Sequence, residues 1–185
     1  MTGSPVSPAS RFGGAHAATA DQRDQMLDAL FRTHCTSLVR VAFVLLGDRE
    51  EAEEVVQDAF VSLHRNWSGL RDTGAAGAYL RAAVVGGCRS RQRRFVRARR
   101  ATNRLAPVPA GGSLEEGTVD TDEAARVTAA VRALPTRQRE VVVARYYLGL
   151  TEAQTAQLLQ VGLGSVKKHA HRALATLQLG IEVTS

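Results

Sequence analysis

The sequence predicts an all-α protein built from two small helical domains joined by a flexible linker. Apolar residues recur at steps of three and four over most of the chain, as on the buried side of amphipathic helices. No segment shows convincing strand character, and residues 101–122 lack any apolar period. We therefore expect a disordered leader (1–20), a first domain (21–100), a linker (101–122) and a second domain (123–180).

Composition favours a polyanionic partner. The 185 residues contain 24 Lys and Arg against 18 Asp and Glu, a formal charge of +6, and nearly all of the basic residues are arginines. The sequence contains no run of eighteen apolar residues, so no membrane span is expected. Residues 1–20 lack the apolar core of a secretion signal, and we expect a cytoplasmic protein.

The sequence offers no recognisable catalytic or metal site. Cys35 and Cys88 have no paired spacing, which favours buried or bystander thiols over a disulfide or metal site. His169 and His171 lie two apart on a predicted helix and so point about 200° apart, which rules out chelation by this pair. Because a nucleophile–base pair and a phosphate-binding Gly loop are also missing, we expect neither cofactor nor enzymatic activity.

A long first helix is predicted over residues 21–46, ended by Gly47 in a left-handed conformation. Its expected buried stripe consists of Met26, Leu27, Leu30, Phe31, Leu38, Val41, Ala42 and Leu45.

A second helix is predicted over residues 48–67, capped by Asp48 with Glu51 as its capping-box partner. Six acidic residues and one Arg lie between positions 48 and 58. Favourable interaction with the helix dipole accounts for the acids of the first turn. It accounts less well for Glu54, Gln57 and Asp58, for which an acidic docking face is an equally good interpretation.

A third helix is predicted from about Ala75, with an interruption at Gly86-Gly87, because each Gly in a helix interior costs about 1 kcal/mol relative to Ala. Residues 89–104 then contain eight Arg and no acid. Such one-sided charge favours phosphate binding over a merely solvated surface.

The second domain is predicted to open with a helix over residues 123–133, broken by Leu134-Pro135. Thr136 is expected to cap the next helix, which ends at Gly149.

Residues 150–177 have the pattern of a helix–turn–helix. Thr151 can cap its first helix, and Gln160-Val161-Gly162 interrupts the helical pattern before a second helix from about Leu163. One side of the second helix is apolar, with Val166, Ala170, Ala173, Leu174 and Leu177. The other side carries polar and basic residues suited to a DNA major groove. A helical hairpin whose basic face is only solvated is the alternative.

Three segments together resemble one protein family, namely AEEVVQDAFVSLHRNW (52–67), AYLRAAVVGGCRSRQRR (78–94) and LPTRQREVVVARYYLGLTEAQTAQLL (134–159). In this order, with an acidic linker between the second and third, they are similar to bacterial group IV, extracytoplasmic-function (ECF) RNA polymerase sigma factors of the sigma-70 family. The chain is most like the actinobacterial SigE-type branch. The resemblance implies a sigma-2 domain, a linker and a sigma-4 domain that direct transcription initiation.

The resemblance also implies partners and contact residues. Core RNA polymerase would bind through its β′ clamp helices, at Glu54, Gln57 and Asp58, and through its β flap; an anti-sigma factor is a possible further partner. The minus-ten promoter element would be bound by Trp67, Tyr79, Arg81, Arg89, Arg91, Arg93 and Arg94, although a Trp such as Trp67 is more often a core residue than a stacking platform. The minus-thirty-five element would be bound by Ser165, Lys167, Lys168, His171 and Arg172.

Four positions depart from the family pattern. The Asn usual near Gly86 and the bulky residue often found at Gly87 are missing, and the other two departures lie in the helix–turn–helix. Gln160 stands where the family commonly has Gly, and a positive φ there would cost about 1–2 kcal/mol. Gly162 replaces the usual Ser or Thr cap of the recognition helix and is a weaker cap. The alternative function is a stand-alone helix–turn–helix regulator that binds duplex DNA as a dimer, but the two unlike domains, the acidic helix and the lack of a dimerisation heptad argue against it.

Overall fold

The computed structural model describes residues 20–70, 73–102 and 121–182, and all regular structure in these ranges is helical. The elements are α1 (Ala20–Leu46), α2 (Arg49–Arg65), η1 (Trp67–Gly69), η2 (Thr73–Ala75), α3 (Ala76–Thr102), α4 (Thr121–Ala133), α5 (Thr136–Val142), η3 (Val143–Tyr147), α6 (Glu152–Leu159) and α7 (Leu163–Glu182). The all-α prediction is confirmed. Residues 1–19 and 103–120, which hold nearly all of the expected leader and linker, lie outside the described residues.

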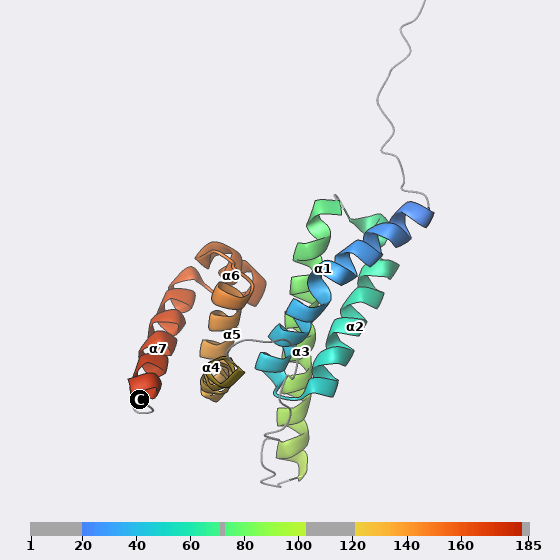
Figure 1. Ribbon diagram of the computed structural model, residues 1–185. Coiled ribbons are helices and arrows are strands. Elements are labelled where there is room, and N and C mark those ends of the chain that lie inside the picture. Colours follow the sequence, from blue (N-terminus) through green and yellow to red (C-terminus); the bar gives the residue numbers. More distant parts are fainter. Residues whose placement is uncertain (1–19, 71–72, 103–120, 183–185) are drawn as a thin grey trace, which may run out of the picture.

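The first domain is formed by α1, α2 and α3, which pack side by side (Figure 1). Gly47 ends α1 with a φ of 86°, and its N–H donates to the carbonyl of Phe43 at 2.7 Å. Asp48 caps α2 as predicted, and its side chain accepts from the Glu51 N–H at 2.9 Å, one of the two bonds of the expected capping box. The expected stripe of α1 is wrong at Phe31, which is 49% exposed and lies edge-on to Phe60 at 5.2 Å.

The expected interruption of the third helix is wrong, because α3 is continuous through Gly86 and Gly87. The reason at Gly87 is tertiary packing. A Cβ on Gly87 would lie 2.9 Å from Cγ1 of Val55, so the missing side chain lets α2 and α3 approach closely. A Cβ on Gly86 would meet nothing within 4 Å. The C-terminal part of α3 projects past the other helices of the domain (Figure 1).

The second domain is formed by α4 to α7. The predicted break at Leu134-Pro135 is confirmed, but Thr136 is not a cap: Pro135 occupies that position without a side-chain hydrogen bond, and Thr136 is the first helical residue. The fixed φ of Pro135 still leads the chain into the helix. After α5 the helix widens into the π-helical turn η3, and Gly149 follows with a φ of 64°.

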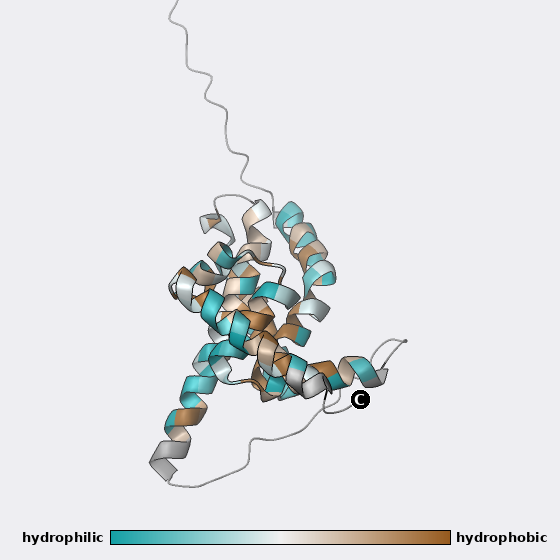
Figure 2. Ribbon diagram, turned by 90° about the vertical axis from the view of Figure 1, so that its left-hand side faces the viewer, coloured by the Kyte–Doolittle hydropathy of each residue, from teal (hydrophilic) through white to brown (hydrophobic). Residues whose placement is uncertain are grey.

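The two domains pack against each other. In Figure 1, α4 and α5 lie beside the C-terminal half of α1, and α7 lies on the far side of the second domain. Buried apolar residues of both domains form one connected cluster, and Figure 2 shows the hydrophobic residues gathered where the helices pack.

Residues Asp21–Leu46 of α1 are long and apolar enough, by length and composition alone, to cross a membrane. This is weak evidence for a span, since the core helix of a soluble protein passes the same test. The C-terminal half of α1 packs on α2 and α3.

The two adjacent glycines of α3 give a matched test of this packing. We expect Gly86→Ala to stabilise the protein by about 1 kcal/mol, the gain in helix propensity. Gly87→Ala has the same propensity gain but forces Val55 away, an overpacking cost of about 1–3 kcal/mol. Urea unfolding followed by circular dichroism should therefore rank Gly86→Ala above wild type and above Gly87→Ala. Equal stability of the two variants would contradict the close approach of α2 and α3.

Candidate functional site

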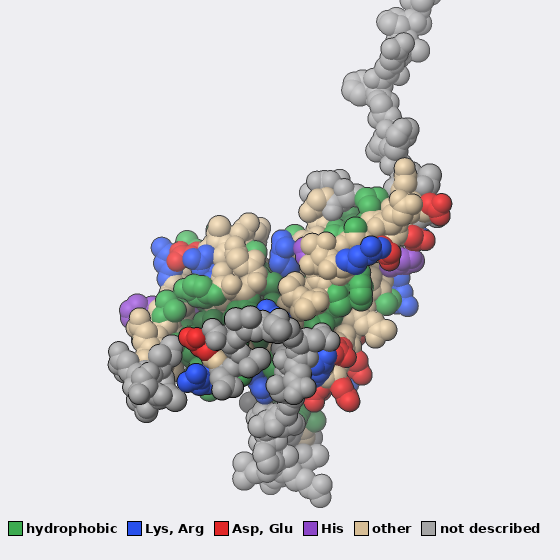
Figure 3. Space-filling view, viewed as in Figure 1, with side chains coloured by type: hydrophobic (Ala, Val, Ile, Leu, Met, Phe, Trp, Pro, Cys, Tyr) green, Lys and Arg blue, Asp and Glu red, His purple; other side chains and the backbone are tan. Residues whose placement is uncertain are grey.

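An acidic surface covers the N-terminal part of α2. Glu54, Gln57 and Asp58 share one side of the helix and are all exposed, with side-chain exposures of 65% for Glu54 and 81% for Asp58. Figure 3 shows acidic side chains gathered over this end of α2. The opposite side of the helix is buried through Ala52, Val55, Val56, Ala59 and Leu63. Burial of that side leaves the predicted docking residues facing outward.

Arg91 of α3 joins this acidic surface. Its Nη1 lies 2.8 Å from Oε2 of Glu54, and its Nη2 lies 3.7 Å from Oδ2 of Asp58. The hydrogen bond with Glu54 raises the pKa of the Arg91 guanidinium above its usual value. The sequence assigned Arg91 and these acids to two different binding surfaces, and the structure brings them together.

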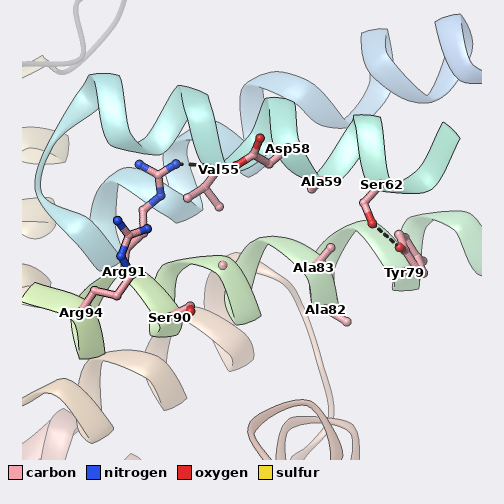
Figure 4. A pocket seen from close by; sticks show the side chains of 11 residues that line it. Val55, Asp58, Ala59, Ser62, Tyr79, Ala82, Ala83, Ser90, Arg91 and Arg94 are labelled. Atoms are coloured by element: carbon pink, nitrogen blue, oxygen red, sulfur yellow. Dashed lines mark hydrogen bonds and ion pairs between the residues drawn. The ribbon is translucent and has the colours of Figure 1, made fainter. Parts of the chain in front are cut away.

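A groove of about 510 Å³ runs between α2 and α3 (Figure 4). Small residues line its middle, including Ala59, Ala83 and Gly87. At one end the Ser62 and Tyr79 hydroxyls share a hydrogen bond of 2.7 Å, and Nδ2 of Asn66 donates to the Tyr79 hydroxyl at 3.2 Å. Asp58, Arg91 and Arg94 line the groove as well, and Figure 4 shows Arg91 directed toward Asp58.

The aromatic residues predicted to contact DNA are partly structural. Trp67 begins η1 and is half-buried against the core, and Tyr79 is half-buried and bonded to α2. Arg81, predicted for the same surface, is also half-buried. For Trp67, the contact with the core supports the alternative noted from sequence.

The arginines of α3 divide into two groups. Arg89 is directed inward, with its side chain 16% exposed, and its Nε donates to Oε1 of Glu140 at 3.0 Å. Arg93 and Arg94 are exposed at the start of the projecting part of α3. The exposed pair is available to a polyanion in this arrangement, whereas Arg89 is occupied within the protein.

The outward side of α7 presents the five predicted duplex-binding residues together. Ser165, Lys167, Lys168, His171 and Arg172 are all exposed. Val166 and Ala173 are fully buried on the opposite side, although Leu174, expected in the same stripe, is 40% exposed. Nζ of Lys167 lies 3.8 Å from a carboxylate oxygen of Glu152.

The turn before α7 has the strained geometry expected from the sequence. Gln160 adopts a φ of 54° and a ψ of 49°, the left-handed conformation that favours Gly. Upstream, Thr151 and Gln154 form a capping box at the start of α6, with bonds of 3.2 and 2.9 Å. Downstream, the carbonyl of Gly162 accepts from the N–H groups of Ser165 and Val166.

Comparison with known proteins identifies the family. The family model described as Sigma-70 region 2 matches residues 30–100, and the model described as Sigma-70, region 4 matches residues 124–177. The chain is 33% identical over 178 residues to the ECF RNA polymerase sigma factor SigM of Mycobacterium tuberculosis, covering 92% of this chain and 88% of that protein. The protein is an ECF sigma factor of the sigma-70 family.

Other relatives agree with this assignment. The RNA polymerase sigma-E factor of Streptomyces avermitilis is 31% identical over 155 residues, 82% of each chain. The fold is shared with the sigma factor RpoE of Bartonella quintana, solved with the anti-sigma factor NepR, at a TM-score of 0.70 and 20% identity over 90% of this chain and 100% of that one. The fold of CnrH, solved with the cytosolic domain of CnrY, matches at a TM-score of 0.60 and 22% identity, over 88% and 96%.

The first domain is therefore sigma-2 and the second sigma-4. As a member of this family, the sigma factor binds core RNA polymerase and promoter DNA and directs transcription initiation, and the resemblance inferred from the sequence is confirmed. Sigma factors as a family are not enzymes. The two thiols of this sigma factor are free, and burial raises the pKa of Cys88 to about 12, so that thiol stays protonated at neutral pH.

Sequence reasoning missed one group of polar residues altogether. Glu140 of α5 is 3% exposed at the side chain and binds Arg89, which lies 51 positions earlier in the chain. A Glu in an apolar stretch, REVVV, is the only local signal, because an ionised carboxylate is rarely buried without a partner.

The strained turn gives a test of how α7 is held. We expect Gln160→Gly to stabilise the sigma factor by about 1 kcal/mol, because Gly adopts a left-handed conformation without the penalty of a Cβ. Thermal unfolding by calorimetry measures the change. Gly162→Ala, at a position with φ below zero and open space, is the matched control and should weaken the cap instead. A loss of stability in Gln160→Gly would contradict the left-handed geometry.

Proposed function

We propose that this sigma factor divides initiation among three surfaces. The acidic side of α2 binds the β′ clamp helices of core polymerase, the arginines of α3 with η1 bind the minus-ten element, and α7 binds the minus-thirty-five element. The observation that carries this proposal is the charge separation on the molecule. Glu54, Gln57 and Asp58 lie exposed on one helix, and the five basic and polar residues of α7 lie exposed on another.

We further place the sigma factor in the cytoplasm, where its polymerase acts, and assign it no catalysis of its own. RpoE was solved with the anti-sigma factor NepR, and CnrH with the cytosolic domain of CnrY. By likeness of fold, we propose that an anti-sigma factor also controls this chain. The alternative of a stand-alone helix–turn–helix regulator is not favoured, since residues 30–100 match sigma-70 region 2.

The polymerase surface is tested by replacing two of its residues with lysine. We expect the double variant Gln57→Lys and Asp58→Lys to lose its complex with core polymerase in gel filtration, because like charge would face the basic partner that the acidic surface implies. Both side chains are exposed, so the fold should be kept.

Asp28→Lys is the control for that experiment. Asp28 is a 72% exposed acid on α1, paired with Arg32 on its own helix, so this variant reverses a surface charge elsewhere on sigma-2. It should still form the complex. Full complex formation by the double variant would contradict the proposed polymerase surface.

The two DNA surfaces should respond differently to substitution. We expect Arg172→Ala in α7 to weaken binding to minus-thirty-five duplex by about 1–3 kcal/mol and to relax its sequence preference. The double variant Arg93→Ala and Arg94→Ala should weaken binding to all sequences alike. Its plot of log affinity against log salt should flatten by up to about 0.9 per lost phosphate contact. Fluorescence anisotropy over a salt series measures both effects.

Arg32→Ala removes one positive charge, as Arg172→Ala does, from an exposed position on α1 that is paired with Asp28, and it should change neither quantity. An unchanged salt slope in the α3 double variant would contradict phosphate binding there. Run-off transcription with core polymerase on genomic promoter fragments, with and without the sigma factor, tests the function as a whole.

A further inference from the structure

The C-terminal end of α1 is held by donors from the other domain. The last turn of α1, residues 43–46, is entirely apolar and supplies no cation for its own free carbonyls. The Leu45 carbonyl accepts from Nη1 of Arg139 at 3.0 Å and from Nε2 of Gln92 at 2.8 Å. The Gly47 carbonyl accepts from Nη2 of Arg132 at 3.2 Å. Two arginines of sigma-4 thus complete a helix end of sigma-2, where positive charge also complements the helix dipole.

Arg132 makes a second contact with the same turn. Its guanidinium carbon lies 5.0 Å from the centre of the Phe43 ring, within the range of a cation–π interaction.

A buried ion pair forms the second part of this interface. Arg89 of sigma-2 binds Oε1 of Glu140 at 3.0 Å and also donates from Nη1 to the Leu159 carbonyl, the last residue of α6, at 2.9 Å. Glu140 keeps a partner of its own domain, because Nη1 of Arg137 donates to Oε2 at 2.9 Å. Both oxygens of the buried carboxylate are therefore satisfied.

We propose that these contacts form an interdomain latch, consisting of Arg89, Arg132, Arg139 and Glu140, which keeps the free sigma factor closed and opens on promoter engagement. This inference rests on the proposed two-surface binding of promoter DNA. In the closed state Arg89, one of the residues assigned to the minus-ten element, is occupied by Glu140 and Leu159. DNA and sigma-4 therefore compete for the same guanidinium.

Geometry requires the opening. The minus-ten and minus-thirty-five elements are separated by about 25 base pairs, or about 85 Å along straight duplex at 3.4 Å per step. A compact chain of this length has a radius of gyration of only about 16 Å. Domains joined by contacts of about 3 Å cannot place α3 and α7 on both elements at once. Sigma-2 and sigma-4 must therefore separate to bind both elements.

The latch can open without stranding a buried charge. When Arg89 leaves, Glu140 still has Arg137, and Arg89 can exchange its carboxylate for a phosphate, which a guanidinium binds in a similar forked geometry. The arginines at the α1 end oppose closure to some degree. Burial lowers the pKa of Arg139, and the positive charge of Arg132 lowers it further. Closure therefore confines two like charges that opening would hydrate.

Closure leaves other surfaces accessible. The outward side of α7 and the exposed Arg93 and Arg94 face solvent in the closed state. The closed sigma factor is thus expected to bind one DNA element weakly, and to be unable to span two.

A distance measurement across the two domains tests the latch. Spin labels are placed on Arg65→Cys in α2 and Thr176→Cys in α7, both exposed positions, in full-length chain carrying Cys35→Ser and Cys88→Ala. Pulsed electron double resonance should give one narrow distance distribution for the free chain. Glu140→Gln should shift most of the population to a broad distribution.

Two further variants make the result specific. Arg89→Met removes the same ion pair from the sigma-2 side and should give the same broad distribution, so local disturbance of sigma-4 cannot account for both. Glu53→Gln removes an equal charge from an exposed pair with Arg49 within α2 and should leave the narrow distribution unchanged. A broad distribution in the latch-intact free chain, matching that of Glu140→Gln, would overturn the proposal.

Adding core polymerase together with a promoter duplex that carries both elements provides the second arm. Formation of the promoter complex should change the narrow distance distribution of the free chain. A promoter complex that forms with that distribution unchanged would refute opening. If no complex forms, the proposed function fails, while the distances in the free chains still decide whether the latch exists.

Discussion

The carbonyl groups at the C-terminal end of α1 need hydrogen-bond donors, and the packing of the two domains supplies them. Helix α1 ends inside the protein, and its last carbonyls need donors that its own apolar turn does not supply. The donors come from Gln92 of α3, Arg132 of α4 and Arg139 of α5. A local requirement of sigma-2 is thereby met by sigma-4, and the two domains are fixed relative to each other in the free protein.

The same physical chemistry explains why arginine is so abundant. A guanidinium remains charged when partly buried and can bind a carboxylate, a carbonyl or a phosphate. Arg89 binds the buried Glu140, and Arg91 binds Glu54 on the surface of α2. Arg93 and Arg94, two and three residues further along α3, are exposed. A run of arginines is therefore not a uniform DNA-binding surface, because helical periodicity directs its members to different sides of the helix.

The DNA-recognition helix α7 is held by a well-packed helix–turn–helix, but the turn before it contains a residue in a strained conformation. The capping box at Thr151 and the buried side of α7 hold the helix–turn–helix, whereas Gln160 carries a conformation unfavourable for any residue with a Cβ. The wider turn η3 before the motif shifts the register of the backbone, and the Leu148 and Leu150 N–H groups bond back to Val143 and Ala144.

The sequence by itself determined the helices, the break at Pro135, the cap at Asp48 and the exposed faces of α2 and α7, because these follow from local periodicity and local hydrogen bonds. Only the tertiary structure decided that α3 passes unbroken through Gly87, where the approach of Val55 outweighs low helix propensity. Only the tertiary structure likewise brings Arg89 into its ion pair with Glu140. That contact depends on how two separately folded units meet, and residues 51 positions apart carry no local signal of meeting.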